Sequence, residues 1–196
     1  MIFKNKSSYD WLVVGLGNPG LQYENTRHNA GFIAADELAK SYNFEFNKTK
    51  FDSVIGEFKI KDKRILIIKP QTYMNNSGRA VQKVSAFYKI PTDRIIVMHD
   101  DISLDVGTIR MRRKGSDGGQ KGMRDIIELL GREDIMRIKI GVGKKPHPEY
   151  DLVNWVLGKF PDEQKEQLET AIKNTAAAVN EIIINGLDSA MNKYSH

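Results

Sequence analysis

The sequence predicts one α/β domain built around a central, mixed β-sheet flanked by helices. Apolar runs of strand length alternate along the chain with segments whose apolar residues recur at helical spacing. The chain has 196 residues, which is typical of a single domain. It contains no internal repeat, low-complexity tract or Pro/Ser-rich linker that would mark a domain boundary. We therefore expect residues 1–196 to form one domain.

The first part of the chain predicts a strand, a helix and a β-hairpin. Residues 11–15 (WLVVG) form a short apolar run of the kind found in buried strands. Apolar residues at helical spacing over residues 31–42 predict a helix, and Thr26 is the nearby candidate for its N-cap. Residues 53–60 and 64–70 flank a short polar turn, which is typical of a hairpin.

The rest of the chain continues the alternation of helices and strands. Residues 107–113 alternate strictly, so that Ile109 and Met111 face one side of a strand while Arg110 and Arg112 face the other. The remaining patterns predict helices over residues 77–89, about 123–130 and 162–184, and strands over residues 94–99 and 135–142.

The composition excludes several classes of protein. Without cysteine the chain forms no disulfide, iron–sulfur cluster or thiolate zinc site, has no cysteine nucleophile, and suits a reducing compartment. No apolar run approaches the roughly 18 residues that cross a bilayer. The first residues (MIFKNKSSYDW) lack the apolar stretch of a secretory signal. We therefore expect a soluble, cytoplasmic protein with no membrane partner.

Positive charge is concentrated in one part of the chain. The net charge of +5 is too small to identify a partner by itself. Residues 107–124, however, contain six Lys or Arg residues and a single acid, Asp117. Such a region indicates either a polyanionic partner such as a nucleic acid or a solvated, charged face.

A glycine motif after the first predicted strand resembles a dinucleotide-binding loop but lacks its physical context. Residues 15–20 (GLGNPG) match G-x-G-x-x-G. That motif requires a helix to begin within the turn, so that its amides hold the pyrophosphate. Here Pro19 and Gly20 break the chain, and a polar run of about eight residues delays the helix. We therefore discount a nicotinamide-dependent oxidoreductase.

Polar residues gather at four places where a predicted strand ends or a helix begins, which is where α/β sheets bind ligands. In the first of them, His28 lies at the start of a helix, and histidine as a residue type titrates near neutral pH. His28 is therefore the candidate general base, and the alternative is an exposed histidine at a helix start. The four segments are residues 18–29, 72–78, 99–105 and 116–122.

The other histidines are weaker candidates. His99 lies at a strand end and fits a buried structural group, His147 lies between prolines in a loop, and His196 is the last residue. The histidines are too scattered for metal-ligand spacing, and there is no H-E-x-x-H motif. We predict no metal site.

Acid and amide side chains complete the candidate site. Asp100 and Asp101 follow an apolar strand, where a carboxylate can orient a histidine or, alternatively, stabilise a turn. The run Asn75-Asn76-Ser77-Gly78 opens a helix, where either asparagine or Ser77 could cap it, or a side-chain amide such as that of Asn75 could donate to a developing oxyanion. A base, an orienting acid and amide donors, with no obvious nucleophilic side chain, suit hydrolysis by an activated water.

These segments resemble the successive signatures of bacterial peptidyl-tRNA hydrolases, in the order of that family. The resemblance covers nearly the whole chain after residues 1–10, which form a short N-terminal extension, and the first motif is the most specific. The matching segments are GLGNPGLQYENTRHNAGF (15–32), KPQTYMNNSG (69–78), HDDISLDVG (99–107), KGSDGGQKG (114–122), IKIGVGKKP (138–146) and LVNWVLGKF (152–160).

The resemblance implies an esterase that separates the peptide from the 3′-terminal ribose of peptidyl-tRNA and so recycles tRNA. It implies a single α/β domain that needs no metal or organic cofactor, and we expect a monomer. His28 would be the catalytic base and Asp100 would orient it. Asn75 would lie near the oxyanion, and Asn18 would position the substrate.

The resemblance also implies residues that contact the substrate or tRNA. Tyr23 and Tyr73 lie within the first two motifs. Arg112, with Arg137 or Lys139, falls where the family contacts the tRNA backbone. The alternation of these basic residues along their strands predicts a basic side that faces solvent.

One motif departs from the family pattern. Family members commonly have G-G-H-N-G where this chain has Gly118-Gly119-Gln120-Lys121-Gly122. Lys121 donates hydrogen bonds and carries charge, whereas asparagine also accepts hydrogen bonds. We therefore interpret Lys121 as a contact to the tRNA 3′ end or a phosphate. The same departure supports an alternative, a tRNA- or RNA-binding protein without catalysis.

Overall fold

A mixed β-sheet forms the centre of the protein. The computed structural model describes residues 8–195, and within them seven strands form one sheet in the order β2-β3-β4-β1-β5-β7-β6. The neighbours β4-β1-β5-β7 are parallel, whereas β2, β3 and β6 pair antiparallel with their neighbours. The strands are β1 (Trp11–Gly15), β2 (Lys48–Lys50), β3 (Ser53–Ile60), β4 (Lys63–Pro70), β5 (Ile95–Asp101), β6 (Ile109–Arg112) and β7 (Met136–Gly141).

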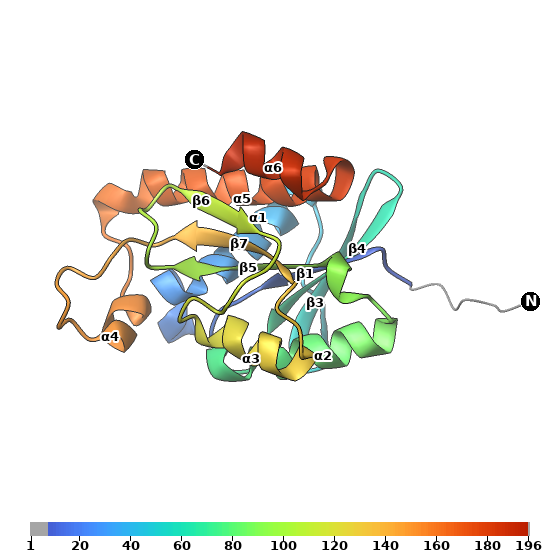
Figure 1. Cartoon of the computed structure of the whole chain (residues 1–196), viewed down its shortest axis with the longest axis horizontal. Helices are drawn as coiled ribbons and strands as arrows, with labels where there is room; N and C mark the ends of the chain where they lie inside the picture. The colour runs from blue at the N-terminus through green and yellow to red at the C-terminus, as the bar shows by residue number, and fades with distance from the viewer. Residues whose placement is uncertain (1–7, 196) are drawn as a thin grey trace, which may run out of the picture.

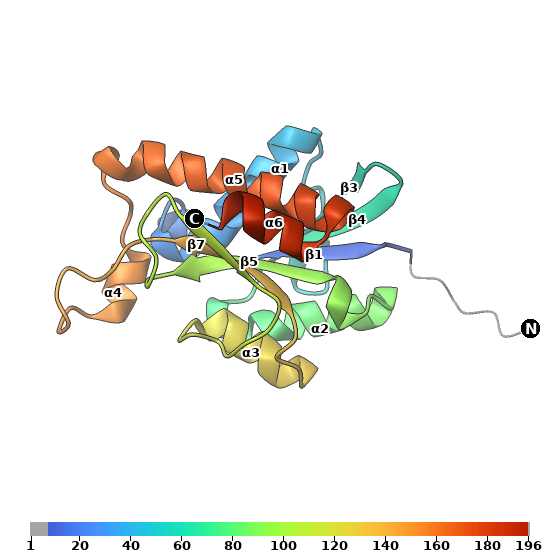
Figure 2. The ribbon, with the colours of Figure 1, turned by 45° about the horizontal axis from the view of Figure 1, so that its top comes forward.

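Helices cover both faces of this sheet (Figure 1). One face carries α1 (Ala30–Tyr42), α5 (Lys165–Asn185) and α6 (Leu187–Tyr194). The other carries α2 (Ser77–Tyr88) and α3 (Lys121–Leu130). A view turned by 45° shows the same layers, with α4 (Leu152–Leu157) standing at one end of the molecule (Figure 2). The predicted fold class is therefore confirmed.

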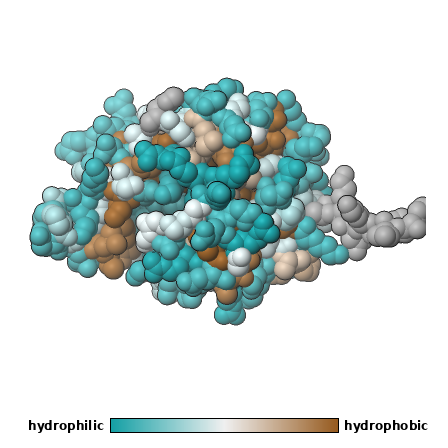
Figure 3. Space-filling model, viewed as in Figure 1, coloured by the Kyte–Doolittle hydropathy of each residue, from teal (hydrophilic) through white to brown (hydrophobic). Residues whose placement is uncertain are grey.

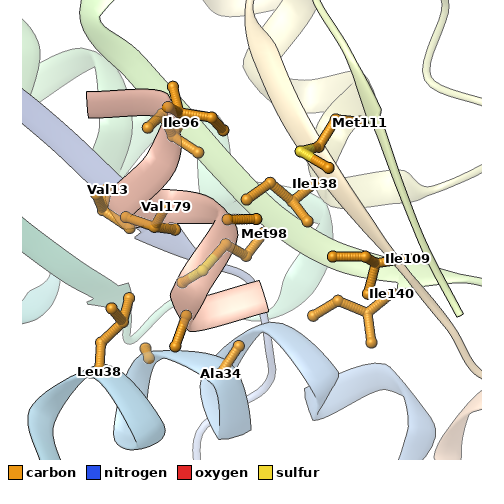
Figure 4. Close-up of a cluster of buried hydrophobic side chains, with 14 of the residues drawn as sticks. Val13, Ala34, Leu38, Ile96, Met98, Ile109, Met111, Ile138, Ile140 and Val179 are labelled. Carbon is orange, nitrogen blue, oxygen red and sulfur yellow. The ribbon is translucent and has the colours of Figure 1, made fainter. Parts of the chain in front are cut away.

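Alternation along the strands gives each face of the sheet its own apolar core. In β5, Ile96 and Met98 pack toward α1 and α5, whereas Ile95 and Val97 pack toward α2 and α3. Figure 4 shows the first of these clusters, where Val179 of α5 lies over the strand side chains. The central strands are covered on both sides, which explains why they are continuously apolar in the sequence.

Most of the predicted elements are present, with short shifts at their ends. The main error concerns the start of α1: the helix begins at Ala30, its N-cap position is Asn29, and Thr26 does not cap it. Thr26 instead precedes a short 3₁₀ turn, Arg27–Asn29, and its hydroxyl donates to the carbonyl of Tyr23. The short elements β2, α4 and α6 were not predicted.

Close packing brings the start of α1 against the ends of β1 and β5. A Cβ atom at Gly31 would collide with the carbonyl oxygen of Met98 and with the backbone of Leu16, so this position requires glycine. The loop after β1 continues for nine residues beyond Gly20 before α1 begins, and the element that directly follows the glycine motif is a three-residue 3₁₀ turn, Leu21–Tyr23, rather than an α-helix. This loop carries His28 to the end of the sheet.

Part of the expected N-terminal extension packs onto the domain. Residues 1–7 of that segment lie outside the described residues. Tyr9 is buried in the cluster beneath α2, and the Asp10 carboxylate accepts a hydrogen bond from the backbone N–H of Arg64. Among the described residues, no helix is both long and apolar enough to span a membrane.

Candidate active site

A cleft of about 350 Å³ opens at the carboxyl ends of the parallel strands. The chain runs from β1 first to β4 on one side of it and later to β5 on the other, so the strand order reverses here. Most of the predicted site residues line this cleft. Its polar lining includes Asn18, His28, Tyr73, Asn75, His99, Asp100, Asp101, Asp117, Gln120 and Lys121.

His28 and Asp100 form a hydrogen-bonded pair within the cleft. The distance between His28 Nδ1 and Asp100 Oδ2 is 2.8 Å, and the side chains are 12% and 3% exposed. Because a carboxylate only accepts, His28 Nδ1 carries the proton and donates it, which leaves the lone pair on Nε2. The 3₁₀ turn Arg27–Asn29 and the end of β5 supply the two groups.

Asp101, the neighbouring acid, faces a different partner. Its Oδ2 accepts a hydrogen bond from Lys139 Nζ of β7 at 2.8 Å, and its Oδ1 accepts from the N–H and hydroxyl of Ser103. Burial raises the pKa of Asp101, but the hydrogen bonds from Lys139 and Ser103 outweigh it and hold that pKa below its ordinary value. Asp101 is thus neutralised by Lys139 rather than by His28.

Asn18 is oriented by its neighbours so that its amide reaches the cleft. Its Oδ1 accepts from the backbone N–H of Met74 at 2.8 Å, which identifies the oxygen and leaves the NH₂ group to line the cleft. The amide side chain of Asn29 spans the Asn18 backbone, accepting from its N–H and donating to its carbonyl. Asn18 is therefore a fixed donor.

Asn75 lines the cleft from the short 3₁₀ turn Met74–Asn76, next to the Met74 backbone that binds Asn18. Its side chain is exposed. In the part of the chain that the structure describes, α2 begins without a side-chain cap, so the capping interpretation of Asn75 is wrong. Tyr73 is 58% exposed and lines the cleft, while Tyr23 packs edge-on against it outside the lining, with ring centroids 6.4 Å apart.

Gln120 makes contacts that the sequence did not indicate. Its side chain is buried before α3, where Oε1 accepts from the N–H of Met123 at 2.6 Å. Its Nε2 donates to Asp100 Oδ1 at 3.0 Å and lies 3.1 Å from Met74 Sδ. Lys121, the first residue of α3, is exposed at the cleft. The unusual Gln-Lys pair was visible in the sequence, but the contact to Asp100 was not.

His99 is a buried neighbour of the pair. Its Nδ1 donates to the carbonyl of Asp100 at 2.7 Å, and its Nε2 has no hydrogen-bond partner among the described residues. Burial lowers the pKa of His99, so the ring is neutral near pH 7. The expectation of a buried group is confirmed. His147 lies outside the cleft lining beside Glu149, and His196 lies outside the described residues.

The basic residues of β6 and β7 do not share one exposed side. Arg112 is exposed on the edge strand β6, beyond the cleft lining. Arg137 is 1% exposed, so its predicted place on a solvent-facing side is wrong. Its guanidinium donates to four backbone carbonyls, those of Gly115, Ser116, Glu133 and Ile135. Arg137 thus binds the backbone of the loop before α3 and holds it in place.

An apolar wall closes one side of the cleft. Leu152 and Val153 of α4 are 40% and 47% exposed there, and Ile102, Val156 and Leu157 complete the wall. Figure 3 shows hydrophobic residues gathered on the surface at the end of the molecule where α4 lies. Exposed apolar surface at a polar cleft is typical of a ligand-binding wall.

Arg27 fastens α4 to the turn that carries His28. Its guanidinium carbon lies 3.7 Å from the centre of the Trp155 ring, and Nη1 donates to the carbonyl of Lys159 at 3.0 Å. Its backbone N–H donates to the carbonyl of Gly158. The apolar wall and the histidine are therefore positioned by one set of contacts.

Within residues 8–195, no group of three or more His, Cys, Asp or Glu side chains is arranged to hold a metal ion. The chemistry that this cleft offers is that of an oriented imidazole with amide donors around it. An imidazole with a free Nε2 can accept a proton from a water molecule, and amide N–H groups can stabilise a developing negative oxygen.

Comparison with known proteins identifies the family. The family model described as peptidyl-tRNA hydrolase matches residues 12–196. The peptidyl-tRNA hydrolase of Thermoanaerobacter sp. (strain X514) is 48% identical over 185 residues, covering 94% of this chain and 99% of that protein. The chain belongs to the peptidyl-tRNA hydrolase family. The family that the motifs indicated, and its class as hydrolases acting on peptidyl-tRNA, are confirmed.

Further members of the peptidyl-tRNA hydrolase family agree in sequence and in structure. The peptidyl-tRNA hydrolase of Clostridium botulinum (strain Eklund 17B / Type B) is 49% identical, over 94% of this chain and 95% of its own length. A crystal structure of peptidyl-tRNA hydrolase from Acinetobacter baumannii superposes with a TM-score of 0.88 at 35% identity. It covers 95% of this chain and 96% of that chain.

Proposed function

We propose that this chain hydrolyses the ester bond between the peptide and the 3′-terminal ribose of peptidyl-tRNA, and thereby recycles tRNA from drop-off products. The observation that carries the proposal is the His28–Asp100 pair at the cleft, in which the Asp100 carboxylate accepts a hydrogen bond from His28 Nδ1. Among the described residues, those that line the cleft include no Ser, Thr or Cys. Direct attack by water fits this lining better than an acyl-enzyme does.

His28 acts as the general base. Its Nε2 takes a proton from water as the water oxygen bonds to the ester carbonyl carbon, and the carbonyl electron pair moves onto the oxygen. Asp100 keeps the proton on Nδ1 and stabilises the imidazolium that forms. When the tetrahedral intermediate collapses, the bond to the ribose oxygen breaks and that oxygen receives the proton from His28. The products are tRNA with a free hydroxyl on its terminal ribose and a peptide carboxylic acid, which releases its proton to solvent and leaves as the carboxylate.

The amide side chains of Asn75 and Asn18 bind the reacting group. Asn75 is the donor for the developing oxyanion, because its side chain is free of capping contacts and lies at the cleft. Asn18 positions the substrate with an NH₂ group whose orientation is fixed by Met74. Tyr73, supported by Tyr23, offers an exposed ring for a base or ribose of the tRNA end.

The two ends of the substrate meet different surfaces. Lys121 lies at the cleft and contacts the tRNA 3′ end or a nearby phosphate, and Arg112 on β6 contacts the backbone. The apolar wall of α4 receives the peptide, whose chain brings apolar side chains and no charge at its blocked amine. We further propose that the protein works as a cytoplasmic monomer without a metal or organic cofactor.

A blocked substrate tests the proposal. We expect rapid release of N-acetyl-amino acid from N-acetyl-aminoacyl-tRNA, with little cleavage of unblocked aminoacyl-tRNA, and on the order of a thousandfold loss of kcat in His28→Ala. His147→Ala is the matched control, since His147 is exposed and outside the cleft lining. Binding of tRNA by the wild-type protein with cleavage of neither substrate would instead establish the binding protein without catalysis.

A further inference from the structure

Gln120 binds the carboxylate oxygen of Asp100 that His28 does not bind. Asp100 gives Oδ2 to His28 Nδ1 at 2.8 Å and Oδ1 to Gln120 Nε2 at 3.0 Å, so both of its oxygens accept side-chain hydrogen bonds. Gln120 is 7% exposed and Asp100 is 3% exposed. A buried carboxylate with both oxygens engaged has little freedom to rotate.

The direction of the Gln120 contact is fixed by the start of α3. The N–H of Met123 donates to Gln120 Oε1 at 2.6 Å, so the oxygen of the amide faces the helix and the NH₂ group faces Asp100. The same NH₂ group also lies 3.1 Å from Met74 Sδ, in the turn that carries Asn75. The neutral side chain of Gln120 therefore contacts α3, Asp100 and the turn Met74–Asn76 that carries Asn75.

We propose that Gln120 is a positioning residue for the hydrolysis: its amide fixes the Asp100 carboxylate, and through it the His28 ring, without adding a group that ionises. This inference rests on the proposed roles of His28 and Asp100. Because an amide does not ionise, Gln120 donates to Asp100 in the same way at every working pH.

The other titratable groups around Asp100 either have partners of their own, are buried and neutral, or are exposed to solvent. On β5, His99 is buried with its pKa lowered, and Asp101 is paired with Lys139 of β7. On the loop before α3, Asp117 is paired with Arg124, and Lys121 is exposed to solvent. On the side of α1, the guanidinium of Arg27 is stacked on Trp155. These contacts leave His28 and Gln120 as the side chains that bind the Asp100 carboxylate.

Gln120→Glu tests the donor while keeping the cap. A glutamate still accepts from Met123 N, but it presents an oxygen in place of the NH₂ group to Asp100. We expect kcat to fall roughly 10- to 100-fold with KM little changed. Two facing carboxylates also share a proton and, once both ionise, hold the imidazolium of His28 to higher pH. The acid limb of the kcat/KM profile should therefore gain a second ionisation and move up by about one pH unit.

Two further measurements separate this inference from the proposed function. An NMR titration of the His28 ring nitrogens needs no substrate, and in Gln120→Glu it should move in the same direction as the acid limb. Gln120→Met removes the donor and the cap without adding charge, so kcat and the melting temperature should both fall while the acid limb stays in place.

A Gln120→Glu protein with wild-type kcat, a single acid ionisation and an unchanged His28 titration would overturn the positioning role. Wild-type kcat in Gln120→Met would overturn it as well, even if Gln120→Glu does not fold. Neither result would affect the proposed hydrolysis, which fails if the wild-type protein does not cleave the blocked substrate or if His28→Ala retains its activity on that substrate.

Discussion

The two neighbouring acids at the end of β5 have the same chemistry and opposite surroundings. Asp100 faces His28 and Gln120, and is bound by groups that belong to the cleft. Asp101 faces Lys139 and Ser103, and its charge is balanced within the protein. Since successive strand side chains point to opposite faces, a shift of one position decides which acid meets the base. The contacts with His28 and Lys139, rather than the residue type, therefore distinguish Asp100 from Asp101.

The largest effect is expected from Asp100→Asn. The asparagine side chain at this position carries no negative charge. It therefore no longer stabilises the imidazolium form of His28, whose Nδ1–H the carboxylate binds. We expect kcat on N-acetyl-aminoacyl-tRNA to fall by on the order of a thousandfold or more, with KM little changed. Steady-state kinetics beside wild type measure it. Retention of more than a tenth of the activity would remove Asp100 from the mechanism.

Asp101→Asn removes the negative charge that balances Lys139. We expect kcat to stay within about threefold of wild type. The free energy of unfolding at pH 7 should fall by about 1 kcal/mol, because Lys139 is left half-buried without its partner. A greater loss of kcat in Asp101→Asn than in Asp100→Asn would reverse the assignment of the two acids.

The stability lost in Asp101→Asn should depend on pH. The folded protein holds the pKa of Asp101 below its ordinary value of 3.8, so the carboxylate stabilises the fold above that pH. This contribution is lost as the pH falls below 3.8 through the lower, folded pKa. Urea unfolding at neutral and at acid pH should therefore show a difference between variant and wild type that disappears in acid.

The smallest effect is expected at Lys121, on the exposed edge of the cleft. Lys121→Asn should leave kcat unchanged and reduce the slope of log affinity for tRNA against log salt by about one, the amount that one phosphate contact contributes. Binding titrations at several salt concentrations measure this slope. An unchanged slope would show that Lys121 does not contact a phosphate.

Local patterns predicted the sheet and the principal site residues because those features depend on near neighbours in the sequence. The apolar strands and the polar residues at their ends are visible as periodicity, and they brought His28 and Asp100 to one edge. The choice between Asp100 and Asp101 required the family resemblance, because strand alternation alone does not say on which side His28 lies. The structure brings Asp100 to His28.

Features that depend on distant partners were missed. Arg137 alternates like an exposed residue, yet it is buried, and the carbonyls of Gly115 and Ser116, 22 and 21 residues earlier in the chain, accept hydrogen bonds from its guanidinium. The contact of Gln120 with Asp100 crosses 20 residues and leaves no local pattern. The short helix α4 has six residues and is fastened largely through Arg27, so neither its length nor its periodicity identified it.

The stacking of Arg27 on Trp155 also gives this protein an optical reporter. Of the two tryptophans in the sequence, Trp11 is buried in the sheet as the first residue of β1, whereas Trp155 lies against Arg27, next to His28. In a protein whose Trp11 is replaced by phenylalanine, all tryptophan emission comes from Trp155. That emission therefore depends on the surroundings of Trp155, which include the segment that carries His28. The fluorescence of one indole then reports, in real time, on the contact between α4 and the turn Arg27–Asn29.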